Sequence, residues 1–343
     1  MASESPRKDE IARSLMVGAL FMLAVLVVLW APFWGMQRIP FRALWGDVSA
    51  SEYGMVEILW KLRIPRVLMA FLAGVGLSTS GMVFQALFRN PLATPYTLGV
   101  SSGASLGAAI AIQCGWSFTL LKVSGVSLCA FLGAVASIVL VYALSARGRH
   151  GSSSATMLLA GVAVSFFFSS VILLLQYVSD FTAAFRILRW VMGGLEHIVS
   201  FREVFGVLPF VISGCLIVWY LVHDLNLLST GEDFAFSRGV NVGAVKFLLF
   251  LGVSLMVGAV VAVCGPIGFV GLVCPHICRL LVGANHRWLF PMSLCFGGAF
   301  LVVCDTAARM MPSELPVGIL TALLGGPFFL WLLLARKQDF GPA

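Results

Sequence analysis

The stretch Val67-Leu-Met-Ala-Phe-Leu-Ala-Gly-Val-Gly-Leu-Ser-Thr-Ser-Gly-Met-Val-Phe-Gln-Ala-Leu-Phe88 decides the fold class of this chain, because it holds no charged side chain over 22 residues. About 20 predominantly apolar residues are enough to cross a bilayer as a helix. A lipid-exposed sheet edge would leave backbone groups unpaired, and the alternating polarity of a membrane barrel is absent. Similar runs predict an all-α integral membrane protein with about ten transmembrane helices. The runs are 15–34, 67–88, 97–121, 123–146, 155–178, 204–222, 244–263, 265–283, 289–311 and 317–335.

The composition of the whole chain supports this class. Hydrophobic residues make up 60% and charged residues 11% of the 343 residues, whereas average proteins hold about 45–50% and about 25%. A soluble globule of this length, a disordered chain and a disulfide scaffold are therefore excluded. The eight cysteines lie almost entirely in apolar runs, where they act as small hydrophobic residues. The net charge of +7 is scattered, so the expected partner is membrane lipid and not nucleic acid.

The runs predict one transmembrane domain over 15–335, with short cytoplasmic tails at 1–14 and 336–343. The first run is longer than the apolar core of a signal peptide, which has about 7–15 residues, so we expect it to be retained. Ten spans place both termini on one side of the membrane. Assigning that side to the cytoplasm puts 12 of the 22 Lys and Arg inside, which is weak support from the positive-inside rule.

Two stretches are unlike regular spanning helices. The first is Asn-Pro-Leu-Ala-Thr-Pro at 90–95, followed by a Gly- and Ser-rich segment at 99–105. The second is Gly-Pro-Ile-Gly at 265–268, which runs into Pro275 and His276. Proline and glycine at membrane depth are tolerated where protein or a water-filled cavity satisfies the backbone. One such segment in each half is typical of a transporter with duplicated halves, and ordinary kinked helices are an equal alternative.

Two connections have amphipathic character. The segment 223–243 is polar but contains Leu and Phe, which predicts one or two short helices at the membrane surface, separated at Gly231. A surface linker is the alternative. The segment 181–202 is also amphipathic, carries three arginines and is broken by Gly193 and Gly194. We expect it on the side opposite to the termini.

A set of short motifs identifies a family. In their order and spacing between residues 63 and 337, they make this chain resemble the permeases of type II ABC importers, the FecCD type, which carry ferric siderophores, haem or vitamin B12. The motifs are RIPR at 63–66, SG at 80–81, QAL at 85–87, RNPLA at 89–93, GVSSGA at 99–104, MGG at 192–194, GPIGFVGL at 265–272, PH at 275–276 and ELPVG at 314–318.

This resemblance implies a vitamin B12 permease-like fold and a multi-pass homodimer in the bacterial inner membrane. It also implies two cytoplasmic ATP-binding subunits and a periplasmic or lipoprotein substrate-binding protein. The sequence agrees, because it has no Gly-x-x-x-x-Gly-Lys-Ser/Thr loop for a nucleotide phosphate. We therefore expect a transport subunit without enzymatic activity or cofactor, moving a metal chelate that is an iron complex with a siderophore or haem.

Two alternatives to this function stay open at this point. One is the same type of permease for vitamin B12. The other is an ion-coupled secondary transporter, which would place acidic residues at mid-membrane as ion or proton sites. Asp305, towards one end of its run, is the one acid well inside an apolar run, so the secondary transporter is disfavoured.

The resemblance assigns docking of the binding protein to Arg63, Arg66 and Arg309, which correspond to arginines that receive carboxylates. The planar guanidinium suits this role because it binds a carboxylate bidentately. Arg63 and Arg66 at a helix end are also compatible with interfacial snorkelling. Asp305 lies four residues before Arg309, so an internal salt bridge is a further possibility that does not exclude docking.

The segment 223–243 resembles the family's coupling segment, which contacts the ATPase; Asp and Phe replace the first Glu and Ala of its usual signature. Its expected coupling residues are Leu228, Gly231, Asp233, Ala235, Arg238 and Gly239.

Polar residues inside the runs either line a path or satisfy neighbouring helices. The candidates are Gln85, Ser101, Ser165, Ser169 and Gln176. Cys274, His276 and Cys278 could ligate a soft metal, but their spacing turns the histidine away from the cysteines on a helix. We therefore predict no metal site.

Overall fold

The computed structural model describes residues 4–44, 53–116, 118–120, 123–146, 154–198, 200–311 and 314–336. Within these residues the protein is almost entirely helical, with one small hairpin in which β1 (Thr119–Leu120) pairs antiparallel with β2 (Val123–Ser124). In the described part of the chain, seven helices are long and apolar enough to span a bilayer, and three more are apolar but shorter. The predicted all-α membrane class is confirmed.

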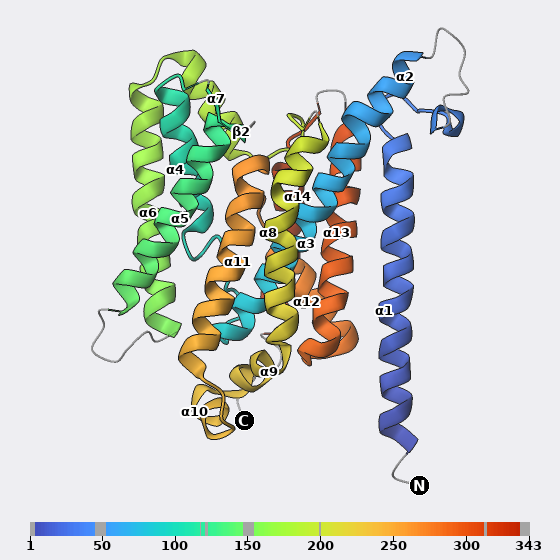
Figure 1. Ribbon diagram of the computed structural model, residues 1–343, viewed down its shortest axis with the longest axis vertical. Coiled ribbons are helices and arrows are strands. Elements are labelled where there is room, and N and C mark those ends of the chain that lie inside the picture. Colours follow the sequence, from blue (N-terminus) through green and yellow to red (C-terminus); the bar gives the residue numbers. More distant parts are fainter. Residues whose placement is uncertain are drawn as a thin grey trace.

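The helix α3 (Ile64–Leu87) is the centre of the fold and runs obliquely through the molecule (Figure 1). It is buried along nearly its whole length because small residues let other backbones approach it. A Cβ atom on Gly74 would overlap the carbonyl oxygen of Gly297 in α13 (His286–Arg309). A Cβ atom on Gly81 would overlap the carbonyl oxygen of Gly271 in α12 (Val270–Val282). The helices α3, α12 and α13 therefore touch backbone to backbone.

A second close contact joins α4 (Val100–Gln113) to α5 (Gly125–Ala146). A Cβ atom on Gly107 would overlap the carbonyl oxygen of Cys129, and one on Gly133 would overlap that of Gly103. Figure 1 shows these two helices on one flank of the molecule, with α1 standing at the opposite flank. The remaining elements are α1 (Glu4–Trp30), η1 (Ala31–Phe33), η2 (Phe41–Leu44), α2 (Tyr53–Glu57), η4 (Ile58–Arg63), α6 (Ser154–Val178), α7 (Phe181–Val191), α8 (Phe201–Tyr220), α9 (Val222–Thr230), α10 (Glu232–Ser237), α11 (Val242–Cys264) and α14 (Val317–Arg336).

The molecule has two distinct ends, which we call upper and lower as they stand in Figure 1. The upper end carries α2 and α7, and the lower end carries α9 and α10 together with the start of α1. The helix α14 begins at the upper end, where Gly318 N donates to Gly193 O in the connection between α7 and α8. It then descends, so the described part of the chain starts and finishes at the lower end.

Several predicted boundaries differ in the structure. The run 97–121 yields a helix only over Val100–Gln113, since a turn with Gly115 at positive φ and the hairpin follow. The run 265–283 becomes helical at Val270, because Gly265 has positive φ and Pro266 has no N–H to donate. Residues 4–14 of the predicted N-terminal tail belong to α1. Residues 1–3, and 337–343 of the predicted C-terminal tail, lie outside the described residues.

The two amphipathic segments form as predicted. Gly231 separates α9 from α10, which together occupy most of 223–243. In the segment 181–202, α7 ends at Val191, shortly before Gly193 and Gly194, and α8 begins at Phe201. The two segments lie at opposite ends of the molecule, as expected (Figure 1).

Candidate functional site

The upper end holds a group of ion pairs, formed by Arg66, Asp305, Arg309 and Glu314, that we call the upper ion network. Arg66 Nε donates to Asp305 Oδ1 at 2.9 Å, and Arg309 Nε lies 3.0 Å from Asp305 Oδ2. Arg66 Nη1 donates to Glu314 Oε2 at 3.2 Å. The Asp305 side chain is fully buried, and a buried carboxylate is tolerated only when cations and donors compensate for lost water.

These four residues come from the start of α3, the end of α13 and the connection before α14, which holds Glu314. Arg66 lies in the first turn of α3, and Asp305 and Arg309 are four residues apart on one face of α13. The internal Asp305–Arg309 salt bridge, which the sequence left open, is present. Arg66 and Arg309 are only 8% and 5% exposed. In this conformation both guanidinium groups are therefore largely covered by protein.

Arg63 lies beside this network at the upper end. Its Nη1 donates to Pro32 O at 3.1 Å, and its Nη2 donates to Gln37 O at 2.6 Å. Arg309 Nη2 donates to Ala31 O, which precedes Pro32 in η1. Arg63 and Arg309 therefore both contact η1, and Asp305 joins Arg309 to Arg66.

The lower end carries the predicted coupling residues on α9 and α10. Leu228 and Ala235 are buried and anchor these two helices to the body of the protein. The outward face is apolar and charged, since Phe234, Phe236 and Asp233 are all exposed. The remaining predicted residues are Gly231, which separates the helices, Arg238, whose guanidinium stacks over Phe234, and Gly239, which has φ of 83° and open space around it.

Asn226 on α9 is a residue that the sequence analysis missed. Its Oδ1 accepts from His286 N at 2.9 Å and lies 2.7 Å from His286 Nδ1, while its Nδ2 donates to Asn285 Oδ1 at 3.1 Å. These bonds fix α9 to the start of α13. The helix α13 therefore connects the lower surface helices to the upper ion network, over roughly 36 Å. The available signal was Asn285, a typical N-cap residue four positions before the apolar run 289–311.

The predicted path residues divide into two groups. Gln85 is buried and joins two helices, because its Nε2 donates to Gly271 O at 3.2 Å and its Oε1 accepts from Arg279 Nη2 at 3.1 Å. Ser101 is also buried. The other three residues share one face of α6: Ser165, which donates to Gly161 O, the exposed Ser169, and the half-buried Gln176.

The two irregular segments meet inside the protein. One cavity of about 300 Å³ is bordered by both segments: by Thr94, Pro95 and Tyr96 from the first and by Ile267, Gly268, Phe269, Gly271 and Leu272 from the second. The non-helical backbone is thus placed next to a cavity, as the sequence predicts for a transporter.

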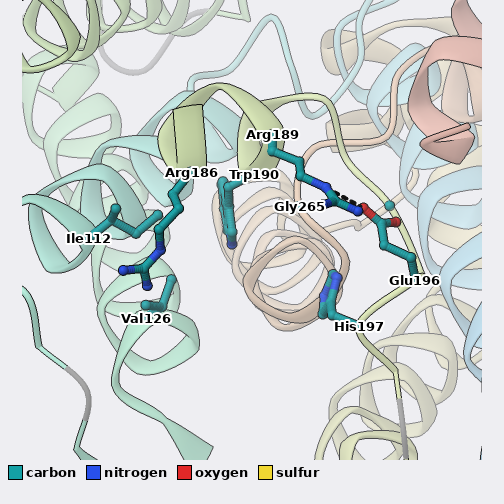
Figure 2. A pocket seen from close by; sticks show the side chains of 9 residues that line it. Ile112, Val126, Arg186, Arg189, Trp190, Glu196, His197 and Gly265 are labelled. Carbon is teal, nitrogen blue, oxygen red and sulfur yellow. Dashed lines mark ion pairs between the residues drawn. The ribbon is translucent and has the colours of Figure 1, made fainter. Parts of the chain in front are cut away.

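A hollow of about 400 Å³ lies under α7 at the upper end (Figure 2). Arg189 pairs across it with Glu196 at 3.6 Å, and Arg186 extends towards Val126 and Ile112 on the facing helices. His197, next to Glu196, contacts the carbonyl oxygen of Val263. The hollow presents basic and apolar groups together. Within the described residues, no cluster of His, Cys, Asp and Glu has the arrangement of a metal site.

Known proteins resemble this chain over most of its length. The FecCD transport family matches residues 20–335. The chain is 38% identical over 328 residues to the hemin transport system permease protein HmuU of Yersinia pestis, covering 95% of this chain and 97% of that protein. It is 41% identical over 304 residues to the cobalamin import system permease protein BtuC of Halobacterium salinarum, covering 87% and 80% respectively.

A solved structure of a metal-chelate type ABC transporter, in an inward-facing conformation, superposes with a TM-score of 0.83. That likeness covers 94% of this chain and 99% of the other, at 31% sequence identity. The family match and the fold both extend over nearly the whole transmembrane part. The chain therefore belongs to the FecCD transport family and is a permease of a type II ABC importer.

Proposed function

We propose that this chain forms a homodimeric permease that moves an iron chelate, a siderophore complex or haem, across the bacterial inner membrane. ATP is hydrolysed by two partner subunits, and a periplasmic or lipoprotein binding protein delivers the substrate. The observation that carries the proposal is the separation of two surfaces on one helical body: an arginine cluster at one end and exposed surface helices at the other. The similarity to a hemin permease over nearly the whole chain supports the choice of an iron complex.

The lower end is the proposed contact with the ATP-binding subunits. Phe234 and Phe236 expose large apolar rings on a short helix, and such groups are typical anchors of protein interfaces. The Lys246–Glu232 ion pair at 2.6 Å ties α10 to α11, and Asn226 ties α9 to α13. A displacement of the surface helices is therefore passed to two membrane helices.

The upper end is the proposed contact with the binding protein, through Arg63, Arg66 and Arg309. Between the ends, we propose that the polar face of α6 lines the path. Ser169 is its exposed member, and Ser165 and Gln176 lie on the same face. Gln85 and Ser101, which were also path candidates, are buried between helices here, so we assign them to helix packing.

Vitamin B12 is the second candidate substrate, favoured by the 41% identity to a cobalamin permease. An ion-coupled secondary transporter is disfavoured by the state of Asp305. This acid is paired with two arginines, so it is not available as a proton or ion site.

Uptake by the reconstituted complex tests the proposal. The chain is placed in liposomes with an ATP-binding subunit and a substrate-binding protein that assemble with it, and uptake of an iron siderophore, haemin and cobalamin is measured with ATP inside. We expect ATP-dependent uptake of an iron complex. Uptake of cobalamin alone would overturn the substrate assignment. Uptake by the chain alone under a proton or sodium gradient would overturn the class of transporter.

A further inference from the structure

The upper ion network and the neighbouring Arg63 together carry one more positive charge than negative charge. Arg63, Arg66 and Arg309 supply three positive charges, and Asp305 and Glu314 supply two negative ones. Asp305 is shared by Arg66 and Arg309, and Glu314 reaches only Arg66. Arg309 Nη1 is buried and has no hydrogen-bond acceptor among the described residues, and its Nη2 contacts only the neutral oxygens of Ala31 and Thr306. A buried guanidinium donor of this kind is suited to a carboxylate.

The two acids of the network differ in how firmly they are held. Asp305 is completely buried in the middle of a long helix, whereas the Glu314 side chain is 48% exposed. Glu314 also has φ of 42°, in the left-handed region that a residue with a side chain rarely adopts. Such backbone positions persist only where surrounding contacts hold them, and they gather at switch regions. The Arg66–Glu314 pair is therefore the contact of the network that opens first.

We propose that Glu314 is an internal substitute for a carboxylate of the docked binding protein. On docking, an Asp or Glu of the partner displaces Glu314 from Arg66 and supplies the acceptor that Arg309 Nη1 lacks. Asp305 stays in place and keeps both guanidiniums oriented. This inference rests on the proposed docking role of the arginines, and it adds that docking is an exchange of carboxylates in competition with the chain itself.

The exchange explains how largely buried arginines serve as a docking site. Arg66 is largely buried and paired with Glu314, so this pair opens before a partner carboxylate reaches Arg66. Glu314 stands three residues before Val317, the first residue of α14. Its release therefore frees the entry to α14 at the same step, so that docking is sensed by a membrane helix.

Docking affinity of the purified, reconstituted permease for its binding protein tests this competition. Glu314→Gln removes the internal carboxylate and keeps the size of the side chain. We expect docking to tighten by about threefold, the range for loss of a partly exposed ion pair. Glu314→Ala, at the same exposed position, gives the same expectation if the glutamine variant is poorly folded.

The matched control is Glu57→Gln, which changes the net charge equally on α2 at the upper end but breaks only the exposed Lys61–Glu57 pair. We expect its docking affinity to stay within the error of the parent's. In an Arg66→Gln background, Glu314→Gln should produce no gain, because the contact it relieves is already absent.

The possible results separate this inference from the docking role itself. Tighter docking in Glu314→Gln but not in Glu57→Gln supports the exchange. Equal docking of these two variants, with weaker docking of the Arg63→Glu, Arg66→Glu double variant, overturns the exchange and leaves the docking role standing. Unchanged docking of the double variant overturns both.

Discussion

Replacing Asp305 by Asn removes the only charge that both buried guanidiniums of the network share in the described structure. Arg66 keeps the half-exposed Glu314, but Arg309 keeps only two neutral oxygens, from Ala31 and Thr306. Breaking a buried pair by removing one partner costs about 3–5 kcal/mol. A cost of 1.4 kcal/mol is tenfold in an equilibrium constant, so the folding constant of Asp305→Asn should fall by about two to three and a half orders of magnitude.

Equilibrium unfolding in mixed micelles, followed by tryptophan fluorescence, measures this change. The double variant Asp305→Leu, Arg309→Met is the control, because apolar replacement of a whole buried pair is often neutral or stabilising. We expect it to recover more than half of the lost stability, since Arg66 can still pair with Glu314. A loss below about 1 kcal/mol in Asp305→Asn would refute the reasoning, because that is the size expected of an exposed pair.

Three further predictions concern transport. The double variant Arg63→Glu, Arg66→Glu should weaken docking of the binding protein at least tenfold at physiological salt, measured by surface plasmon resonance; equal affinity would remove the docking assignment. Gly239→Val forces a branched residue into φ of 83°, so ATP hydrolysis should continue while transport is lost, and normal coupling would contradict the role of this loop. Asn226→Ala removes the hydrogen bonds between α9 and α13, so fewer substrate molecules should move per ATP hydrolysed, with assembly of the complex unchanged; a parent-like ratio would argue against this connection.

The sequence predicts helices well here because membrane spans are long and nearly free of charge. Their ends are harder to predict, and the run 97–121 shows why. Hydropathy continues through residues 114–121, but Gly115 turns the chain and a hairpin follows. Hydropathy averages over side chains and does not detect a single backbone reversal.

The site was only partly predictable for a related reason. Asp305 and Arg309 are four residues apart, so their pairing follows from helix geometry. The Arg66–Asp305 pair joins residues 239 apart in the chain, and no local pattern reveals it. The same holds for Asn226 and His286, whose contact depends on where α9 lies against α13.

The glycine contacts of the fold also decide where the protein is able to bend. Where two backbones touch at Gly74 and Gly81, or at Gly107 and Gly133, no layer of side chains remains that could deform, so each helix group behaves as a stiff unit. The chain passes from the first unit, which contains α3, to the second, which contains α4, through residues 88–99. This connection has prolines at 91 and 95 and borders a cavity. We therefore expect alternating access to arise from one stiff unit tilting against the other about this link, with little internal sliding in either.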